Sequence, residues 1–253
     1  LFNDANAMLD DVINNKKLTA KAVFGLFPAN RAQDDIQLYT DESRTEPLMK
    51  LHQLRQQSKK PAGQYNRCLA DYVADKASGV DDYVGAFAVS AGFGVEALVK
   101  AFNADHDDYN SILIKAVADR LAEASAEYLH EQIRQKYWGY APDENLANDD
   151  LIREKYQGIR PAPGYPACPE HTEKGLLWEL LKVEENIGME LTSSFAMWPG
   201  AAVSGWYFAH PDAKYFAVAK VAQDQVESYA ARKEMTMPQA ERWLSANLDY
   251  EPS

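Results

Sequence analysis

The chain has 253 residues and a net charge of −12, with 46% hydrophobic and 25% charged residues. This composition predicts a folded globular protein, and its acidity argues against binding to nucleic acid or to an anionic membrane surface, because both require a basic footprint. No apolar run approaches the roughly 20 residues that cross a bilayer, and no secretory signal peptide is evident. Two cysteines do not make a disulfide framework, so we expect a cytoplasmic protein.

The first residues predict a helix, because apolar residues recur at helical spacing from Leu1 to Ile13. The chain starts with Leu1 rather than with Met, and no capping residue precedes this helix. We therefore expect the sequence to be a piece of a longer protein.

Three strands are predicted next. Residues 21–30 (KAVFGLFPAN) form an apolar run that we expect to end at Pro28. After a turn at residues 34–35, residues 36–40 alternate like a second strand, and the two predict an antiparallel hairpin. Residues 82–91 (DYVGAFAVSA), rich in aromatic and small apolar side chains, predict the third strand.

Residues 47–70 contain five basic residues and no acidic one, which is unusual in so acidic a chain. The basic residues are Lys50, Arg55, Lys59, Lys60 and Arg67. Residues 60–63 (KPAG) predict a loop within this stretch. Its charges belong either to an ordinary solvated loop or to a docking surface for an acidic partner.

The longest predicted element is a helix over residues 108–137, where apolar side chains recur at helical spacing. Asp107 or Asp108 can cap it, and Gly139 can end it. Its polar face carries Asp119, Glu123, Glu127 and His130. By periodicity alone this face is solvated.

The remaining elements are short. Residues 173–183 predict a helix, and residues 189–195, 203–209 and 215–219 predict strands. A capping box at Thr236 predicts the start of a last helix. Strands clustered around long helices, without regular β-α-β alternation, predict an α+β fold.

One glycine motif favours two interpretations. Residues 92–97 (GFGVEA) fit the pattern G-x-G-x-x-A of dinucleotide-binding turns, and Asp119 lies at a suitable distance for a ribose contact. That pattern also needs a parallel strand soon after its helix, which the sequence does not predict. Tight packing of strand against helix is the simpler interpretation, and a nicotinamide-dependent oxidoreductase using Gly92, Gly94 and Ala97 is the alternative function.

Other catalytic patterns are not evident. The five histidines show no metal-binding spacing, and neither cysteine has a second cysteine nearby. No phosphate-binding loop or nucleophile elbow occurs. The sequence therefore predicts no metal site.

Residues 160–169 (RPAPGYPACP), here called the proline-rich segment, contain four prolines and cannot form regular structure. Prolines keep such a segment extended and lower the entropy lost on binding. Gly164 removes a side chain, Tyr165 offers a flat face, and Arg160 offers a fork that suits a carboxylate or a phosphate. The segment is either a surface linker or a stiff support for a flat polar ligand.

Several stretches together resemble the C-terminal activation domain of cobalamin-dependent methionine synthase. They are RPAPGYPACPEHTEK, KAVFGLFPAN, FAVSAGFGVE and GMELTSSFAMWPGAAVSGWYFAHP. The resemblance implies an α+β fold, a twisted antiparallel sheet with long flanking helices. It also implies that residues 1–253 are a single S-adenosylmethionine-binding domain that lacks its N-terminal segment, which in the family supplies a further acidic ligand contact.

The function implied by the resemblance is reactivation of methionine synthase. S-adenosylmethionine would donate a methyl group, and flavodoxin an electron, to restore methylcobalamin from inert cob(II)alamin. The cobalamin would be held by a neighbouring domain, and any zinc would lie elsewhere in the full protein. An interaction module without a small ligand remains a third class.

The resemblance also assigns residues. The expected S-adenosylmethionine-binding residues are Arg160, Ala162, Gly164, Tyr165, Tyr215, Phe216 and Glu123. Arg160 is expected to hold the ligand carboxylate, and the backbone of the proline-rich segment to meet adenine and ribose. Lys59 and Lys60 are the candidate docking residues for flavodoxin, an acidic protein.

Overall fold

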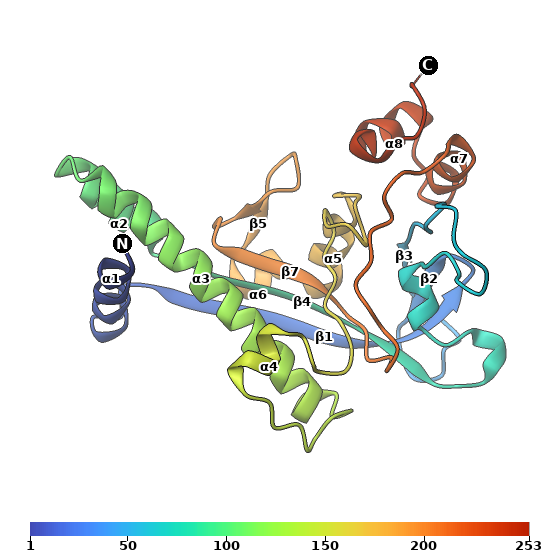
Figure 1. Ribbon diagram of the computed structural model, residues 1–253, viewed down its shortest axis with the longest axis horizontal. Coiled ribbons are helices and arrows are strands. Elements are labelled where there is room, and N and C mark those ends of the chain that lie inside the picture. The colour runs from blue at the N-terminus through green and yellow to red at the C-terminus, as the bar shows by residue number, and fades with distance from the viewer. Residues whose placement is uncertain (253) are drawn as a thin grey trace.

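A computed structural model describes residues 1–252 (Figure 1). Its central feature is a five-stranded antiparallel sheet in the order β3-β2-β1-β4-β7. The strands are β1 (Thr19–Ala32), β2 (Asp35–Tyr39), β3 (Pro47–His52), β4 (Asp82–Phe93) and β7 (Ala202–Tyr207). A separate ribbon pairs β5 (Glu190–Leu191) with β6 (Met197–Trp198).

Helices flank this sheet and extend beyond it (Figure 1). They are α1 (Phe2–Asn14), α2 (Val95–Ala104), α3 (Asp108–Gln132), α4 (Asn148–Ile152), α5 (Glu173–Leu181), α6 (Val183–Ile187), α7 (Gln223–Arg232) and α8 (Met237–Trp243). A π-helical turn at Ile133–Tyr137 continues α3. The predicted α+β fold with an antiparallel sheet and long helices is confirmed.

The predicted hairpin is present, but its first strand is longer than expected. β1 runs through Pro28 to Ala32 and pairs with β4 over most of its length. Pairing with β2 starts only at Ala29, so Pro28 lies where the strand has a neighbour on one side. A proline without an N–H is tolerated at such an edge, and the expectation that the strand ends there is wrong.

The long helix α3 crosses the sheet and places its small residues against it (Figure 1). Asp107 caps α3 by accepting a hydrogen bond from the Asn110 N–H, as expected. Ala118 and Ala122 pack on Ala91 at the end of β4, and Ala126 packs near the centre of the sheet. Alanines allow the helix backbone to approach the strands closely. This contact fixes the distance between α3 and the sheet, and with it the position of the polar face of α3.

Several later predictions need correction. Of residues 189–195 only Glu190–Leu191 form a strand, and residues 215–219 are extended but belong to no ladder. The backbone of this second segment bonds elsewhere: Gln56 Nε2 donates to Ala217 O at 2.7 Å, and Val218 N donates to Pro166 O at 2.8 Å. The helix predicted over 173–183 is broken at Lys182, which has a φ of 45°. Strand β3 and helix α7 were not predicted.

Besides the two small apolar clusters under α3, two larger apolar cores form. The larger one lies between the sheet and the segments that cover it, and includes Trp206 and Leu177. The smaller one joins α7 and α8 through buried side chains such as Tyr229 and Leu244. The proline-rich segment and residues 215–219 lie next to each other, since Val218 N donates to Pro166 O, and between them they contain six of the seven predicted ligand residues.

Candidate functional site

The proline-rich segment extends the sheet beyond β7. Ile159, just before it, exchanges two backbone hydrogen bonds of 3.0 Å with Phe208, and Trp206 N donates to Pro161 O at 2.9 Å. Gly205 makes this approach possible, because a Cβ atom there would lie 2.5 Å from Pro161 O. The segment is thus a fixed part of the sheet rather than a loose linker.

Gly164 makes the tight turn within this segment. Its φ is +91°, and a Cβ atom would lie 2.4 Å from His171 Cε1, so only glycine fits. Its N–H donates to Cys168 O at 2.7 Å, and Cys168 N donates to Tyr165 O at 2.9 Å. Tyr165 follows the turn with 65% of its surface exposed, so its ring is available to a ligand or partner.

Arg160 lies under this turn with its guanidinium tied to three groups. Nη2 is 2.7 Å from Glu127 Oε2, and Nη1 is 2.9 Å from Tyr156 Oη and 3.1 Å from His130 Nδ1. None of these contacts uses Nε. The guanidinium is therefore fixed in direction, while two of its five donors, the Nε–H and one Nη2–H, stay uncommitted.

His130 helps to set that direction as a neutral ring. It is fully buried, and burial, followed by the charges of Arg134 and Arg160, holds its pKa well below the usual value. A neutral imidazole accepts at Nδ1 from Arg160 when it carries its proton on Nε2. The ring stacks on Tyr207, with centroids 5.0 Å apart.

Buried polar atoms without a partner surround Arg160. Among residues 1–252, Glu127 Oε1, His130 Nε2, Arg134 Nη1 and Tyr207 Oη have no hydrogen-bond partner. Such atoms are usually satisfied by ordered water or by polar groups of a ligand. Their concentration here marks the surroundings of Arg160 as a polar site and not as ordinary core.

Tyr215 lies on the other edge of the proline-rich segment. Its hydroxyl accepts a hydrogen bond of 3.0 Å from Arg160 N, and burial raises the pKa of the Tyr215 phenol. Phe216 differs, because its ring packs into both apolar cores beside Tyr72. Of this predicted aromatic pair, only Tyr215 contacts the proline-rich segment through its side chain.

Glu123 is exposed on α3, one turn before Glu127. Within the described residues no hydrogen bond or ion pair ties its carboxylate, whereas Glu127 holds Arg160. The sequence placed both on one polar face but did not distinguish Glu127 or His130. Helical spacing was the only available signal for these two, and nothing in the sequence indicated Tyr156.

A cavity of about 390 Å³ borders the proline-rich segment. Its lining includes Ala162, Gly164, Tyr165, Lys174 and Ser204. Arg160, Tyr215, Phe216 and Glu123 lie outside that lining, so the seven predicted residues do not line one common cavity.

The glycine motif at residues 92–97 serves packing. A Cβ atom at Gly94 would lie 2.6 Å from Lys17 O, and one at Gly92 would lie 2.6 Å from Pro199 Cβ. Helix α2 leads directly into α3, and β4 pairs only with antiparallel strands. A cavity of about 720 Å³ does lie beside this motif and includes Asp119, but the parallel strand that a dinucleotide site needs is absent from residues 1–252.

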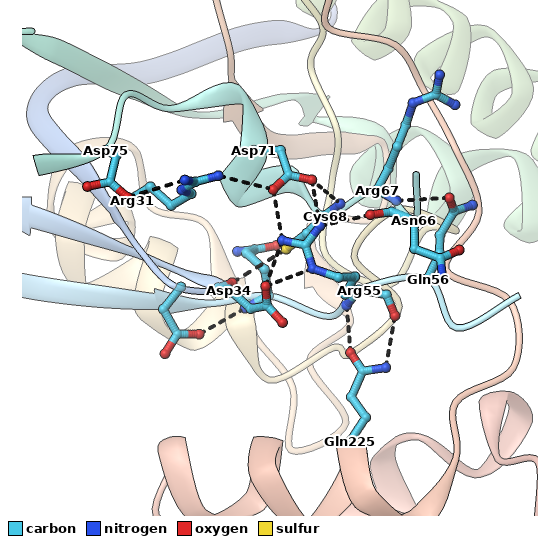
Figure 2. Close-up of polar contacts among 12 residues, drawn as sticks. Arg31, Asp34, Arg55, Gln56, Asn66, Arg67, Cys68, Asp71, Asp75 and Gln225 are labelled. Carbon is cyan, nitrogen blue, oxygen red and sulfur yellow. Dashed lines mark hydrogen bonds and ion pairs between the residues drawn. The ribbon is translucent and has the colours of Figure 1, made fainter. Parts of the chain in front are cut away.

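Not every basic side chain of residues 47–70 is free to contact a partner. Figure 2 shows Arg55 clamped between two carboxylates, with Nη2 at 2.7 Å from Asp34 Oδ1 and Nη1 at 2.7 Å from Asp71 Oδ2. Gln225 of α7 accepts from Arg55 N at 2.6 Å and donates to Arg55 O at 2.8 Å. Among the described residues no ion pair ties the side chains of Lys59 or Lys60, and Lys50 and Arg67 are also without one, so these four residues share the unpaired positive charge of the stretch.

Among residues 1–252, no group of three or more His, Cys, Asp and Glu side chains is placed to hold a metal ion. No helix in this part of the chain combines the length and the apolar character that crossing a membrane requires.

Comparison with known proteins agrees with this architecture. The family model described as "Vitamin B12 dependent methionine synthase, activation domain" matches residues 1–234. A solved structure titled "Crystal Structure of the MetH Reactivation Domain bound to AdoHcy" is similar, with 63% sequence identity and a TM-score of 0.96. The similarity covers 99% of this chain and 77% of that one. The chain therefore belongs to the activation-domain family of vitamin B12-dependent methionine synthase, a methyltransferase.

Proposed function

We propose that this domain binds S-adenosylmethionine along the proline-rich segment and so supports reductive methylation of cobalamin on a neighbouring domain. The observation that carries the proposal is the fixed pair of Arg160 and Tyr215 beside that segment. The similar solved domain is titled as bound to AdoHcy, which keeps the adenosine and carboxylate of S-adenosylmethionine and lacks its methyl group.

The residues present suit such a ligand. Arg160 has its Nε–H uncommitted by the contacts described above, and a carboxylate accepts strongly from a guanidinium. The Ala162 N–H has no backbone partner among residues 1–252 and lies on the same edge as the Arg160 N–H, which suits a flat heterocycle. Tyr165 offers an exposed ring, and the Glu123 carboxylate a counter-charge, for a sulfonium.

The chemistry supplied by the bound ligand is a transferable methyl group. The chain's own residues orient the ligand, and none of them needs to act as a general base. We infer that the isolated domain does not turn over, because the cobalamin, and any zinc, belong to other domains. The partners proposed are that cobalamin-binding domain and flavodoxin, in the cytoplasm.

Calorimetry with S-adenosylmethionine and with S-adenosylhomocysteine tests the proposal. Arg160→Ala should cost about 1.5–3 kcal/mol of binding free energy, a Kd higher by roughly 10- to 150-fold, because it removes a charge-assisted contact. Arg242→Ala, an exposed arginine of α8, is the matched control and should leave the Kd unchanged. Equal affinity of Arg160→Ala and the wild type would exclude the role of Arg160.

A titration with NADH addresses the alternative function. The antiparallel surroundings of the glycine motif predict no saturable binding. Saturable NADH binding without any S-adenosylmethionine binding would reverse the proposal.

A further inference from the structure

We propose that Lys233, at the end of α7, is a positioning residue for the proline-rich segment and thereby for the ligand. Among residues 1–252, Lys233 makes no hydrogen bond or ion pair with any of the seven predicted ligand residues, so it acts through Glu170. The affinity part of this inference rests on the proposed function, while its structural part does not.

Glu170 is the first residue after the proline-rich segment, and its carboxylate is buried and fully engaged. Oε1 accepts from Thr172 N at 2.7 Å, and Oε2 accepts from Thr172 Oγ1 at 2.5 Å. Two groups of α7 also reach Oε2: Lys233 Nζ at 2.7 Å and Tyr229 Oη at 3.1 Å. The end of the proline-rich segment is therefore fastened to α7.

Lys233 bridges a second buried carboxylate. Its Nζ also contacts Glu173 Oε1, and Glu173 Oε2 accepts from His52 N at 3.1 Å. Lys233 is 8% exposed, Glu170 1% and Glu173 0%. Burial lowers the pKa of Lys233, but Glu173 and Glu170 outweigh it and raise that pKa overall, so the amine stays charged.

The segment between this cluster and the ligand residues is stiff. The Gly164 N–H bonds to Cys168 O at 2.7 Å, and Cys168 lies two residues before Glu170. Cys168 is itself buried, as is Ala167. A displacement at Glu170 is therefore transmitted to the turn at Gly164 instead of being absorbed by a flexible loop.

Removal of the amine leaves two buried carboxylates that repel each other. A buried ion cluster that loses one partner cannot keep its geometry, because the remaining charges must take up protons or water. Glu170 keeps Thr172 and Tyr229 as partners but lies in no helix, whereas Glu173 is held within α5 and by His52, so we expect Glu170 to be the carboxylate that moves. We expect its movement to shift Gly164 and Tyr165.

NMR spectra of protein labelled with 15N-glycine test the structural part. The chain has 13 glycines, so such a spectrum contains few amide signals, and the signal of Gly164 reports on the turn. In Lys233→Met the Gly164 resonance should move, and the Kd for S-adenosylmethionine should rise on the order of tenfold. Lys233→Arg, which keeps the charge, should restore both readouts towards the wild type.

Arg232→Met is the matched control. Arg232 is the preceding residue of α7 and pairs with buried Asp35, but it contacts β2 and Gln53 O rather than the proline-rich segment. The variant Arg232→Met should lower the thermal stability without shifting the Gly164 resonance or changing the Kd for S-adenosylmethionine. If Lys233→Met does not fold, Lys233→Met combined with Glu170→Gln relieves the repulsion but still lacks the ion pair that fastens Glu170 to α7, so the Gly164 resonance should still be displaced.

Any one of three results would overturn the inference. In the first, both the Gly164 resonance and the Kd of Lys233→Met match the wild type. In the second, Arg232→Met changes this resonance and this Kd as much as Lys233→Met does, and in the third the double variant keeps the wild-type Gly164 resonance. Failure of the wild type itself to bind S-adenosylmethionine would instead refute the proposed function, and the glycine resonances would still decide the role of Lys233.

Discussion

Arg160 is held before any ligand arrives, and this has an energetic consequence. Glu127, Tyr156 and His130 each fix part of its guanidinium. A side chain that is already ordered loses little entropy when it binds, so its contacts contribute more to affinity. The groups behind Arg160 should therefore affect binding although they need not touch the ligand.

Glu127→Gln tests this at the residue scale. It removes the carboxylate that lies 2.7 Å from Arg160 Nη2 and should raise the Kd for S-adenosylmethionine roughly three- to tenfold through a less ordered guanidinium. Calorimetry measures the change, with Glu131→Gln on the same helix as the control. An unaltered Kd in Glu127→Gln would show that Arg160 keeps its direction without this partner.

His130 should make stability depend on pH. Its pKa is depressed in the folded protein by burial and by Arg134 and Arg160, so below about pH 6.5 the unfolded chain binds a proton that the folded chain does not. The free energy of unfolding should therefore fall as the pH decreases below that value, by at most about 1.4 kcal/mol per pH unit for this group. His171, whose pKa is lowered mainly by burial, contributes in the same direction.

Urea unfolding between pH 5 and pH 7.5 measures this slope, and His130→Gln isolates the contribution of His130. The variant should show a smaller loss of stability on acidification than the wild type. Parallel curves for the two proteins would mean that His130 is protonated in the folded state.

At the scale of elements, the close contact between β7 and the proline-rich segment depends on Gly205. A Cβ atom there would meet the backbone oxygen of Pro161, which cannot rotate away. Gly205→Ala should lower the free energy of unfolding by about 1–3 kcal/mol and weaken S-adenosylmethionine binding. Gly200→Ala is the control, because nothing lies within 4 Å of its Cβ position. Equal stabilities in chemical unfolding of the two variants would refute the argument.

Two elements, residues 215–219 and helix α7, were predicted wrongly for the same reason: polar contacts with distant residues hold them in place. Residues 215–219 have an extended, apolar sequence like a strand, yet their backbone groups bond to Gln56 and Pro166. Helix α7 has only a short apolar stripe, Val226, Tyr229 and Ala230, and polar contacts of Gln225 and Lys233 also hold it in place. Local periodicity does not report polar contacts between residues far apart in sequence.

At the scale of the whole molecule, the charge of −12 hides an uneven distribution. Arg55 is neutralised by Asp34 and Asp71, whereas Lys59, Lys60 and Arg67 have no ion pair among residues 1–252 and keep the loop beside it positive (Figure 2). An acidic electron donor would be repelled by most of the surface and steered toward such a local exception.

Charge reversal tests this surface. Lys59→Glu with Lys60→Glu should slow association with flavodoxin several-fold at low salt, and the difference should shrink as salt is added. Stopped-flow measurement gives the rates, and Lys16→Glu, an exposed lysine at the end of α1, is the control. Equal rates for the double variant and the control would place the docking surface elsewhere.

The sequence by itself determined what depends on neighbours along the chain: the hairpin, β4, the capped helix α3 and the irregular proline-rich segment. It also determined the family, through motifs that recur as a set. Only the tertiary structure decided that Glu127, and not Glu123, holds Arg160, and that α7 fastens Glu170 through Lys233. Those contacts join residues 33 and 63 positions apart, and burial of charge selects such partners only once the chain has folded.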